Sequence, residues 1–468
     1  MSRLRGELMR KVVHISMGGF ALLLRWITPA QAALLAIIAL LFNLFVLHRL
    51  TRRALLREGE RGSGYSRGIV LYPAAVLVLI VVFRDRMELA AAVWGFLAFG
   101  DGMATVAGVL AQGGKLPWNP QKSWAGFLAF VFNGTAAAAF LIRWTQLAGR
   151  DVTPAAESVS FSFLGVGGDA QEFVFLVSAC FVAALAAAFA ESLATGIDDN
   201  ILVPLVGGGT LFAATLVQPA LLGARADVLL TALGWGALVN ALLAGLAYVL
   251  RSVSVSGAVG GWVLGTALFT FGGWRGFLML FLFFALGTLA TKLGYGRKLE
   301  LGIAQEKGGR RGVKNALANT LTGVLFAFLA ASTATPEIFT AALVAAFATA
   351  VCDTVSSETG QAYGRTHLLI TNFRRVPPGT DGAVSLEGTL AGLAASASLA
   401  AIAWQVGLLT LPVAGIVAAA GFAGATIESY LGATVEKLDL LDNDLVNFAN
   451  TMIGALIALV ATRIVLGA

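Results

Sequence analysis

Two series of polar residues interrupt an otherwise apolar chain of 468 residues, and their side chains are of the kinds that hold phosphate groups and divalent cations. The first series consists of Arg10, Lys11, His14, Asp101, Lys122, Ser123, Glu191, Asp198, Asp199 and Asn200. The second consists of Arg310, Arg311, Lys314, Asp353, Glu358, Gly379, Thr380, Asp381, Gly382, Glu428, Asp442 and Asn443. Carboxylate and amide oxygens suit Mg²⁺, while lysine, arginine and glycine-rich backbone neutralise phosphate charge. These residue types predict phosphoryl or nucleotidyl transfer, which depends mainly on positioning and charge neutralisation.

The two series follow the same order along the chain. Each has a basic helix start, an aspartate within an apolar run, a glycine- and proline-rich loop with a serine, a Glu-Ser pair and an Asp/Asn cluster. A carboxylate inside a membrane span costs about 2.5–3.5 kcal/mol, which favours a functional role for Asp101 and Asp353. We interpret the series as a pseudo-repeat of two catalytic halves, residues 1–250 and 251–468. Chance similarity is the alternative, because the spacing differs between the halves.

The composition determines the elements that must position these residues. Hydrophobic residues make up 58% of the chain, charged residues 12%, and the mean hydropathy is +0.82. The apolar residues come in runs of about 20, the length that crosses a bilayer as helix. These values predict an all-α polytopic membrane protein and exclude a soluble enzyme, a disordered chain and a disulfide scaffold. The net charge of +6 does not indicate a nucleic-acid partner, because the basic residues lie in short loops.

About 15 spans are expected, some of them broken or re-entrant where glycine or proline interrupts them. They lie near 12–28, 30–48, 68–83, 88–111, 123–143, 171–193, 201–218, 228–250, 255–272, 275–292, 313–332, 336–362, 384–404, 408–430 and 445–466. A cytoplasmic N-terminus places 24 of the 32 lysine and arginine residues on the cytoplasmic side, as the positive-inside rule requires. Both polar series then face the cytoplasm, where nucleotides are found, and the protein is expected in the cell membrane.

The common nucleotide-binding motifs are absent from the sequence. The segment from Gly108 to Lys115 approaches a Walker A motif, but its spacing is off by one and Leu116 replaces the required serine or threonine. Protein-kinase motifs are also missing. Any nucleotide site must therefore be of a kind specific to membrane proteins.

The first half resembles the phytol kinase and dolichol kinase family, which is related to the CDP-diacylglycerol synthases. The resemblance depends on short motifs: Arg10-Lys11-x-x-His14, Gly100-Asp101-Gly102, Lys122-Ser123-x-x-Gly126, Glu191-Ser192-Leu193, and Asp198-Asp199-Asn200 with Pro204. Ala125 departs from the family, which usually has glutamate there. The second half is similar to the phytyl-phosphate kinase family. Its motifs are Cys352-Asp353-Thr354-x-Ser356-Ser357-Glu358, the loop from Pro377 to Gly382, and Glu428-Ser429-Tyr430-Leu431-Gly432.

The resemblance implies a fusion of two consecutive kinases. The first would phosphorylate a long-chain isoprenoid alcohol such as phytol or geranylgeraniol, and the second would convert the monophosphate to the diphosphate, with CTP and Mg²⁺. Asp101, Asp198, Asp199 and Asn200 would hold metal in the first site, and Asp353, Asp442 and Asn443 in the second. Glu191, Glu358 and Glu428 are candidate catalytic carboxylates, beside Asp101 and Asp353. The basic residues of both series, with His14, Ser123 and the Gly379–Gly382 loop, would bind nucleotide or phosphate.

Two other functions fit the same residues. The first, implied by the relation of the first half's family to the CDP-diacylglycerol synthases, is a cytidylyltransferase that forms a CDP-lipid and releases pyrophosphate instead of CDP. The second is a transporter, because internal repeats with intramembrane aspartates are also typical of transporters. The crowding of polar residues at one membrane face argues against a transport path through the midplane. The preference for CTP over ATP, the length of the alcohol and the oligomeric state are left open.

Overall fold

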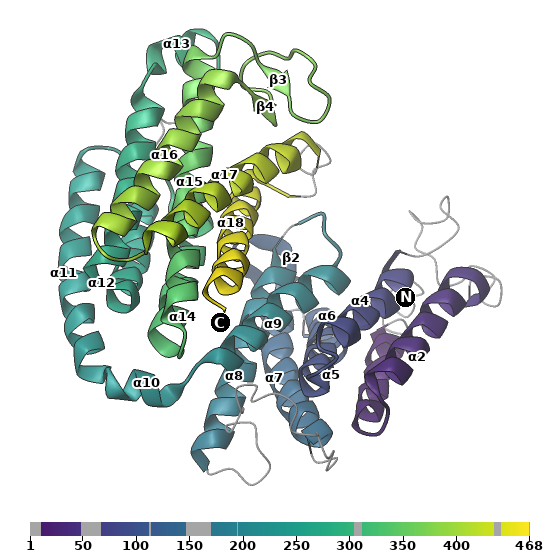
Figure 1. Cartoon of the computed structure of the whole chain (residues 1–468). Coiled ribbons are helices and arrows are strands. Elements are labelled where there is room, and N and C mark those ends of the chain that lie inside the picture. Colours follow the sequence, from purple (N-terminus) through teal and green to yellow (C-terminus); the bar gives the residue numbers. More distant parts are fainter. Residues whose placement is uncertain are drawn as a thin grey trace. The chain divides into compact units, whose positions relative to one another are not determined.

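The computed structural model describes residues 11–47, 67–111, 114–146, 170–193, 195–303, 311–434 and 441–467, and it is almost entirely helical (Figure 1). Arg10 and Arg310 lie outside these ranges. Within the described residues, 12 helices are long and apolar enough to cross a membrane. Every expected span coincides with a helix or part of one. The helical membrane class is therefore confirmed.

The chain divides into two compact units, Met1–Thr215 and Leu216–Ala468. The expected boundary at residue 250 differs from this division, because the helix at 226–249 packs closely against the helix that follows it in the second unit. The assignment of one reaction to each half stays a prediction.

The first unit is built around one continuous helical rod, which is mostly buried from Met87 to Gly102 and more exposed toward Leu110. The rod comprises α5 (Met87–Gly95), a π-helical turn η4 (Phe96–Gly100) and α6 (Asp101–Leu110). Residues Leu89–Val93 are almost completely buried, so α5 is apolar on every side and forms the core. The remaining elements are η1 (Gly18–Arg25), α2 (Pro29–Phe42), η2 (Asn43–Leu47), α4 (Arg67–Val82), β1 (Lys115–Leu116), β2 (Asn119–Ser123), α7 (Trp124–Gln146), α8 (Ala170–Ser192) and α9 (Asp199–Leu216).

The second unit surrounds α15 (Pro336–Tyr363), whose buried middle from Ala341 to Ala350 contains six alanines. Because these side chains are small, neighbouring helices approach α15 closely. Its neighbours are α12 (Val255–Lys292), α14 (Val313–Ser332), α16 (Leu386–Gln405), α17 (Leu411–Thr434) and α18 (Asn443–Leu466). The other elements are α10 (Pro219–Ala224), α11 (Ala226–Val249), α13 (Tyr295–Glu300), β3 (Leu368–Leu369) and β4 (Ala383–Val384).

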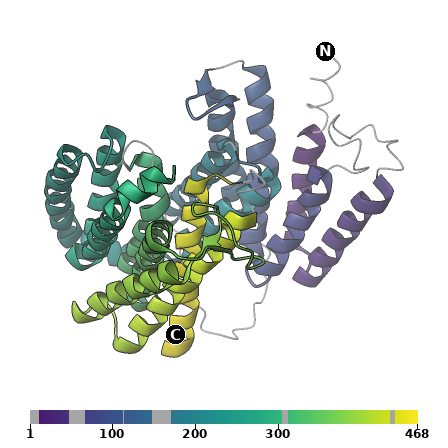
Figure 2. The same ribbon diagram turned by 90° about the horizontal axis from the view of Figure 1, so that it is seen from above.

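Helix α12 is long enough for two spans and is broken in the middle. Gly273 has φ +63° and ψ −174°, a conformation that only glycine adopts readily. The break falls between the two spans expected at 255–272 and 275–292. The first part of α12 runs beside α11 in both views (Figures 1 and 2).

Candidate functional site

Asp101 is placed by glycines on either side of it in the buried rod. The π-helical turn η4 ends at Gly100, and Asp101 begins α6. A Cβ on Gly100 would lie 2.9 Å from the Phe130 ring of α7, and a Cβ on Gly102 would overlap the Ile15 side chain. Both neighbours therefore approach the rod more closely than a larger residue would permit. π-Helical turns within α-helices are frequent at functional sites.

The segment around Ile15 brings two basic residues to Asp101. The Lys11 ammonium donates to the Asp101 carboxylate at 2.7 Å. His14 Nε2 donates to the Leu97 carbonyl at 2.8 Å and lies 3.4 Å from the same carboxylate oxygen. Asp101 is only 3% exposed, so this buried carboxylate is paired, as a charge inside a membrane helix requires. The structure thus brings together three of the predicted site residues, Lys11, His14 and Asp101, whose roles toward phosphate and metal stay predictions.

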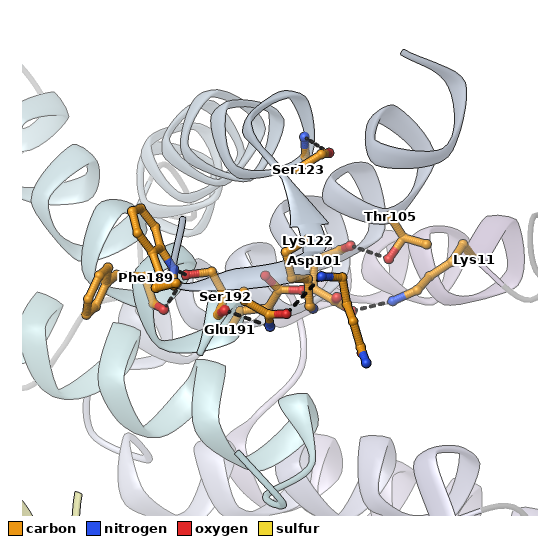
Figure 3. Close-up of polar contacts among 12 residues, drawn as sticks. Lys11, Asp101, Thr105, Lys122, Ser123, Phe189, Glu191 and Ser192 are labelled. Atoms are coloured by element: carbon orange, nitrogen blue, oxygen red, sulfur yellow. Dashed lines mark hydrogen bonds and ion pairs between the residues drawn. The ribbon is translucent and has the colours of Figure 1, made fainter. Parts of the chain in front are cut away.

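A short β-ribbon supplies the second lysine. Strands β1 and β2 pair antiparallel, and the ribbon is attached to the end of α8. Trp118 Nε1 donates to Ser192 Oγ at 2.9 Å, and Asn119 Nδ2 donates to the Ser192 carbonyl at 3.0 Å. This attachment brings Lys122 into a hydrogen-bonded ion pair with Glu191 (Figure 3). Burial by itself would lower the pKa of Lys122, but the carboxylates of Glu191 and Asp199 outweigh it and raise that pKa, so the ammonium stays charged.

Three carboxylates converge between these two lysines. One oxygen from each of Asp101, Glu191 and Asp199 lies within 4.8 Å of the other two. Ligand oxygens around an octahedral Mg²⁺ stand about 3–4 Å apart, so a small inward movement would bring all three into its coordination shell. Asn200, the next residue on α9, is 8% exposed, and its Oδ1 atom has no hydrogen-bond partner. The hard oxygen donors of the cluster, and the unpaired amide oxygen on the residue next to Asp199, fit a divalent cation.

Two residues predicted for this site have local structural partners. Asp198 Oδ1 accepts from the backbone N–H of Asn200 at 3.0 Å and from its Nδ2 at 2.6 Å, which caps the start of α9. Ser123 Oγ accepts from the Gly126 N–H at 3.2 Å and caps α7. Asp198 thereby orients Asn200, and Ser123 fixes the junction between the ribbon and α7. Their predicted contacts with metal and phosphate stay predictions.

In the second unit, three of the predicted carboxylates take part in two separate pairs. Asp353 on α15 hydrogen-bonds through its side chain with Glu428 on α17. Two carboxyl groups that hydrogen-bond to each other share a proton, and such a pair could hold a cation in its place. Glu358, five residues before the end of α15, pairs instead with Lys298 of α13. Lys298 is 1% exposed and also donates to the Thr291 carbonyl at 2.8 Å.

The two described basic residues of the second series, Arg311 and Lys314, have different surroundings. The Arg311 guanidinium lies over the Phe283 ring at 5.4 Å and close to Gly287. Burial lowers the pKa of Arg311, and the charge of Glu358 opposes that effect. Lys314 is exposed near the start of α14 and interacts electrostatically with Asp444.

The remaining predicted residues lie in a loop and a helix cap. Gly379 and Gly382 have φ of +82° and +72°, and Gly382 packs against the Ser429 carbonyl at the end of α17. Between them, Asp381 is exposed, and Thr380 Oγ1 donates to the Pro377 carbonyl at 2.8 Å. Two residues sit at the start of α18: Asp442 caps the helix by accepting from Leu445 N at 2.9 Å, and Asn443 is its exposed first residue. Among the described residues, Asp442 belongs to no cluster of three His, Cys, Asp or Glu side chains that could share a metal ion.

The two units share one local arrangement around their aspartates. In the first, Gly126 of α7 packs on the Ala104 carbonyl, three residues after Asp101. In the second, Gly388 of α16 packs on the Ser356 carbonyl, three residues after Asp353. The serine three residues before each of these glycines accepts from its N–H at 3.2 Å. The same crossing therefore places an aspartate beside a serine-capped helix in both units.

Three residues that contribute to these sites were not singled out in the sequence. Lys298 belongs to a run of basic residues whose clearest signal is membrane orientation, so its burial has no local signature. Trp118 and Asn119 contact Ser192, which is more than 70 residues away along the chain. The proline on each side of the Trp-Asn pair indicates a turn, but not the partner of that turn.

Comparison with known proteins agrees with the membrane fold. Residues 238–455 match the family described as "Integral membrane protein DUF92". The chain is 38% identical over 225 residues to the protein VTE6, chloroplastic, of Arabidopsis thaliana, a match that covers 47% of this chain and 68% of that protein.

Two further relatives carry the names of kinases. A probable phytol kinase 2 of Oryza sativa subsp. japonica and a farnesol kinase of Arabidopsis thaliana are each 30% identical over 213 residues, or 42% of this chain. The matches cover 63% and 62% of those proteins. No solved structure matches the chain. The chain belongs to the DUF92 family of integral membrane proteins.

Proposed function

We propose that the chain is a membrane kinase that phosphorylates an isoprenoid alcohol in its first unit and the resulting monophosphate in its second. A nucleoside triphosphate, with CTP as the expected donor, supplies the phosphoryl group. The observation that carries the proposal is the buried cluster of Asp101, Glu191 and Asp199 with its two lysines. Relatives named phytol kinase and farnesol kinase support the choice of an isoprenoid alcohol.

The cluster has the parts that phosphoryl transfer needs. The three carboxylates would hold Mg²⁺, which neutralises charge on the transferred group. Lys11 and Lys122 have flexible side chains that are 21% and 34% exposed, and they would contact the phosphate oxygens. The alcohol oxygen attacks the terminal phosphorus, the bond to the nucleoside diphosphate breaks, and a carboxylate of the cluster accepts the hydroxyl proton.

The membrane location suits this substrate. Extracting an isoprenoid tail into water would cost about 0.8 kcal/mol for each CH₂ group. An enzyme whose polar site lies at the end of membrane helices leaves the tail in the bilayer and receives only the hydroxyl group. In the second unit, the Asp353–Glu428 pair and Arg311 are the groups we assign to the monophosphate reaction.

Substitution of the two matching aspartates tests the proposal. We expect Asp101→Asn to abolish conversion of alcohol to monophosphate while added monophosphate still becomes diphosphate. Asp353→Asn should let monophosphate accumulate. Asparagine retains the volume, and loss of a hard ligand should lower the rate by orders of magnitude. The assay uses purified protein, phytol or geranylgeraniol and labelled CTP, with products separated by chromatography.

Asp85→Asn is the matched control, because the Asp85 side chain is 85% exposed in the same unit. It should leave both steps unchanged. A folded single variant that loses both steps would show one composite site and contradict the assignment of one step to each unit. Release of pyrophosphate in place of CDP would identify a cytidylyltransferase.

A further inference from the structure

The two lysines of the first unit cover the carboxylates that they pair with. The side chain of Asp101 is 4% exposed and that of Glu191 is 6% exposed. Their partners Lys11 and Lys122 are several times more exposed, at 21% and 34%. Figure 3 shows both lysine side chains reaching the acidic groups from other elements of the unit. Each ammonium group therefore lies at the accessible side of a buried carboxylate.

The charges of this cluster allow a direct exchange. Three carboxylates and two ammonium groups leave one net negative charge. One divalent cation in place of the two ammonium groups leaves the same net charge. The buried carboxylates could therefore accept Mg²⁺ without a change in the charge enclosed by the unit, provided that both lysines move away. Binding the cation in addition to both lysines would instead leave one net positive charge in a poorly solvated site, which is costly.

The side chains of both lysines can change rotamer while the backbone segments that carry them stay in place. Lys122 lies on β2, whose ribbon is fixed to α8 by Trp118 and Asn119 through backbone and side-chain contacts of Ser192. The strand can keep its position while the four-carbon side chain changes rotamer. Lys11 lies on the first described helix, and its partly exposed side chain has the same freedom. Ammonium groups are compact point charges that suit phosphate oxygens.

We propose that Lys11 and Lys122 are resident counter-ions that a divalent cation displaces, so that metal binding releases both ammonium groups to the phosphates of the nucleotide. This inference rests on the proposed phosphoryl transfer and adds an order of events to it. The lysines compete with the metal for the carboxylates and cooperate with it in binding nucleotide. Metal and nucleotide then raise each other's affinity. Bound metal frees the lysines to contact the nucleotide, and bound nucleotide keeps the lysines away from the carboxylates.

Titration of Mn²⁺ without nucleotide tests the exchange. The full-length protein in lipid nanodiscs is titrated with Mn²⁺, and free Mn²⁺ is measured by electron paramagnetic resonance. We expect Lys122→Met to bind Mn²⁺ about 10- to 100-fold more tightly than the unchanged protein, because a competing positive charge is gone. The same variant should bind CTP more weakly in the presence of Mn²⁺. Glu191→Gln should bind Mn²⁺ more weakly.

Lys115→Met is the matched control, because Lys115 is an exposed lysine on β1 of the same ribbon. It should leave Mn²⁺ affinity unchanged. If Lys122→Met fails to fold, Lys11→Met gives the same comparison. Unchanged or weaker Mn²⁺ binding in a folded Lys122→Met or Lys11→Met variant would overturn the exchange, since it would show lysines that hold the carboxylates in place for the metal. These readouts need no turnover, so absence of kinase activity would count against the proposed function alone.

Discussion

The buried pair of Lys298 and Glu358 provides a test that separates stability from catalysis in the second unit. The two side chains are 1% and 5% exposed. Replacing one partner leaves a buried charge without compensation, which destabilises a protein by about 3–5 kcal/mol. For a unit of this size, 1 kcal/mol lowers the melting temperature by about 2–4 °C. We therefore expect Lys298→Met or Glu358→Gln to lower the melting temperature by roughly 6–20 °C.

The double variant distinguishes a structural role of the pair from a catalytic role of Glu358. Lys298→Met combined with Glu358→Gln removes both charges, so we expect it to regain more than half of the lost stability. Melting is followed by circular dichroism in detergent, and conversion of added isoprenyl monophosphate is measured on the same samples. A stable double variant without activity would support Glu358 as a catalytic carboxylate. A stable, active one would show that the pair holds α13 against α15.

An exposed pair in the same unit serves as the control for this cycle. Arg365 and Glu387 are 3.9 Å apart, and the Arg365 side chain is 92% exposed. Surface ion pairs contribute little, so Glu387→Gln should change the melting temperature by no more than a few degrees. Strictly additive losses at Lys298 and Glu358 would refute the reasoning, because they would show that the two charges do not compensate each other.

Three further outcomes are expected, two from the geometry and one from the distribution of basic residues along the chain. Gly126→Ala should destabilise the first unit by about 1–3 kcal/mol in thermal unfolding, because its Cβ would lie 2.8 Å from the Ala104 carbonyl, whereas Gly209→Ala, with open space around it, should be neutral or stabilising. Gly273→Ala should cost about 1–3 kcal/mol by the same measurement, because its φ of +63° with ψ near 180° strains any other residue. Cysteines introduced at 60–66 and at 300–309 should be protected from an impermeant thiol reagent in intact cells, and labelling of both from outside would reverse the predicted orientation.

The helices could be predicted because the bilayer requires them. The run at 313–332 becomes α14 with the same bounds, and the interruption at Gly272-Gly273 becomes the break in α12. In both cases the information is local: the length of an apolar run and the position of a glycine. A backbone inside hydrocarbon must satisfy its own hydrogen bonds, so long apolar runs have few alternatives to helix.

The site could be predicted only in part, because its geometry depends on partners distant in sequence. Residue types pointed to Asp101, Glu191 and Asp199, and the structure brings these three together. The two lysines that pair with the cluster were also among the predicted residues, but their partners could not be assigned. Nothing local distinguishes Lys298 from its basic neighbours, since its burial depends on Glu358, 60 residues further along.

The three lysine–carboxylate pairs have the same direction along the chain, and this matters while the protein is being made. Lys11 precedes Asp101 by 90 residues, Lys122 precedes Glu191 by 69, and Lys298 precedes Glu358 by 60. Synthesis proceeds from the N-terminus, so each lysine has left the ribosome before the helix that carries its carboxylate reaches the bilayer. A lone carboxylate resists insertion by about 2.5–3.5 kcal/mol. In these three pairs, the helix that carries the carboxylate is therefore made after its neutralising lysine.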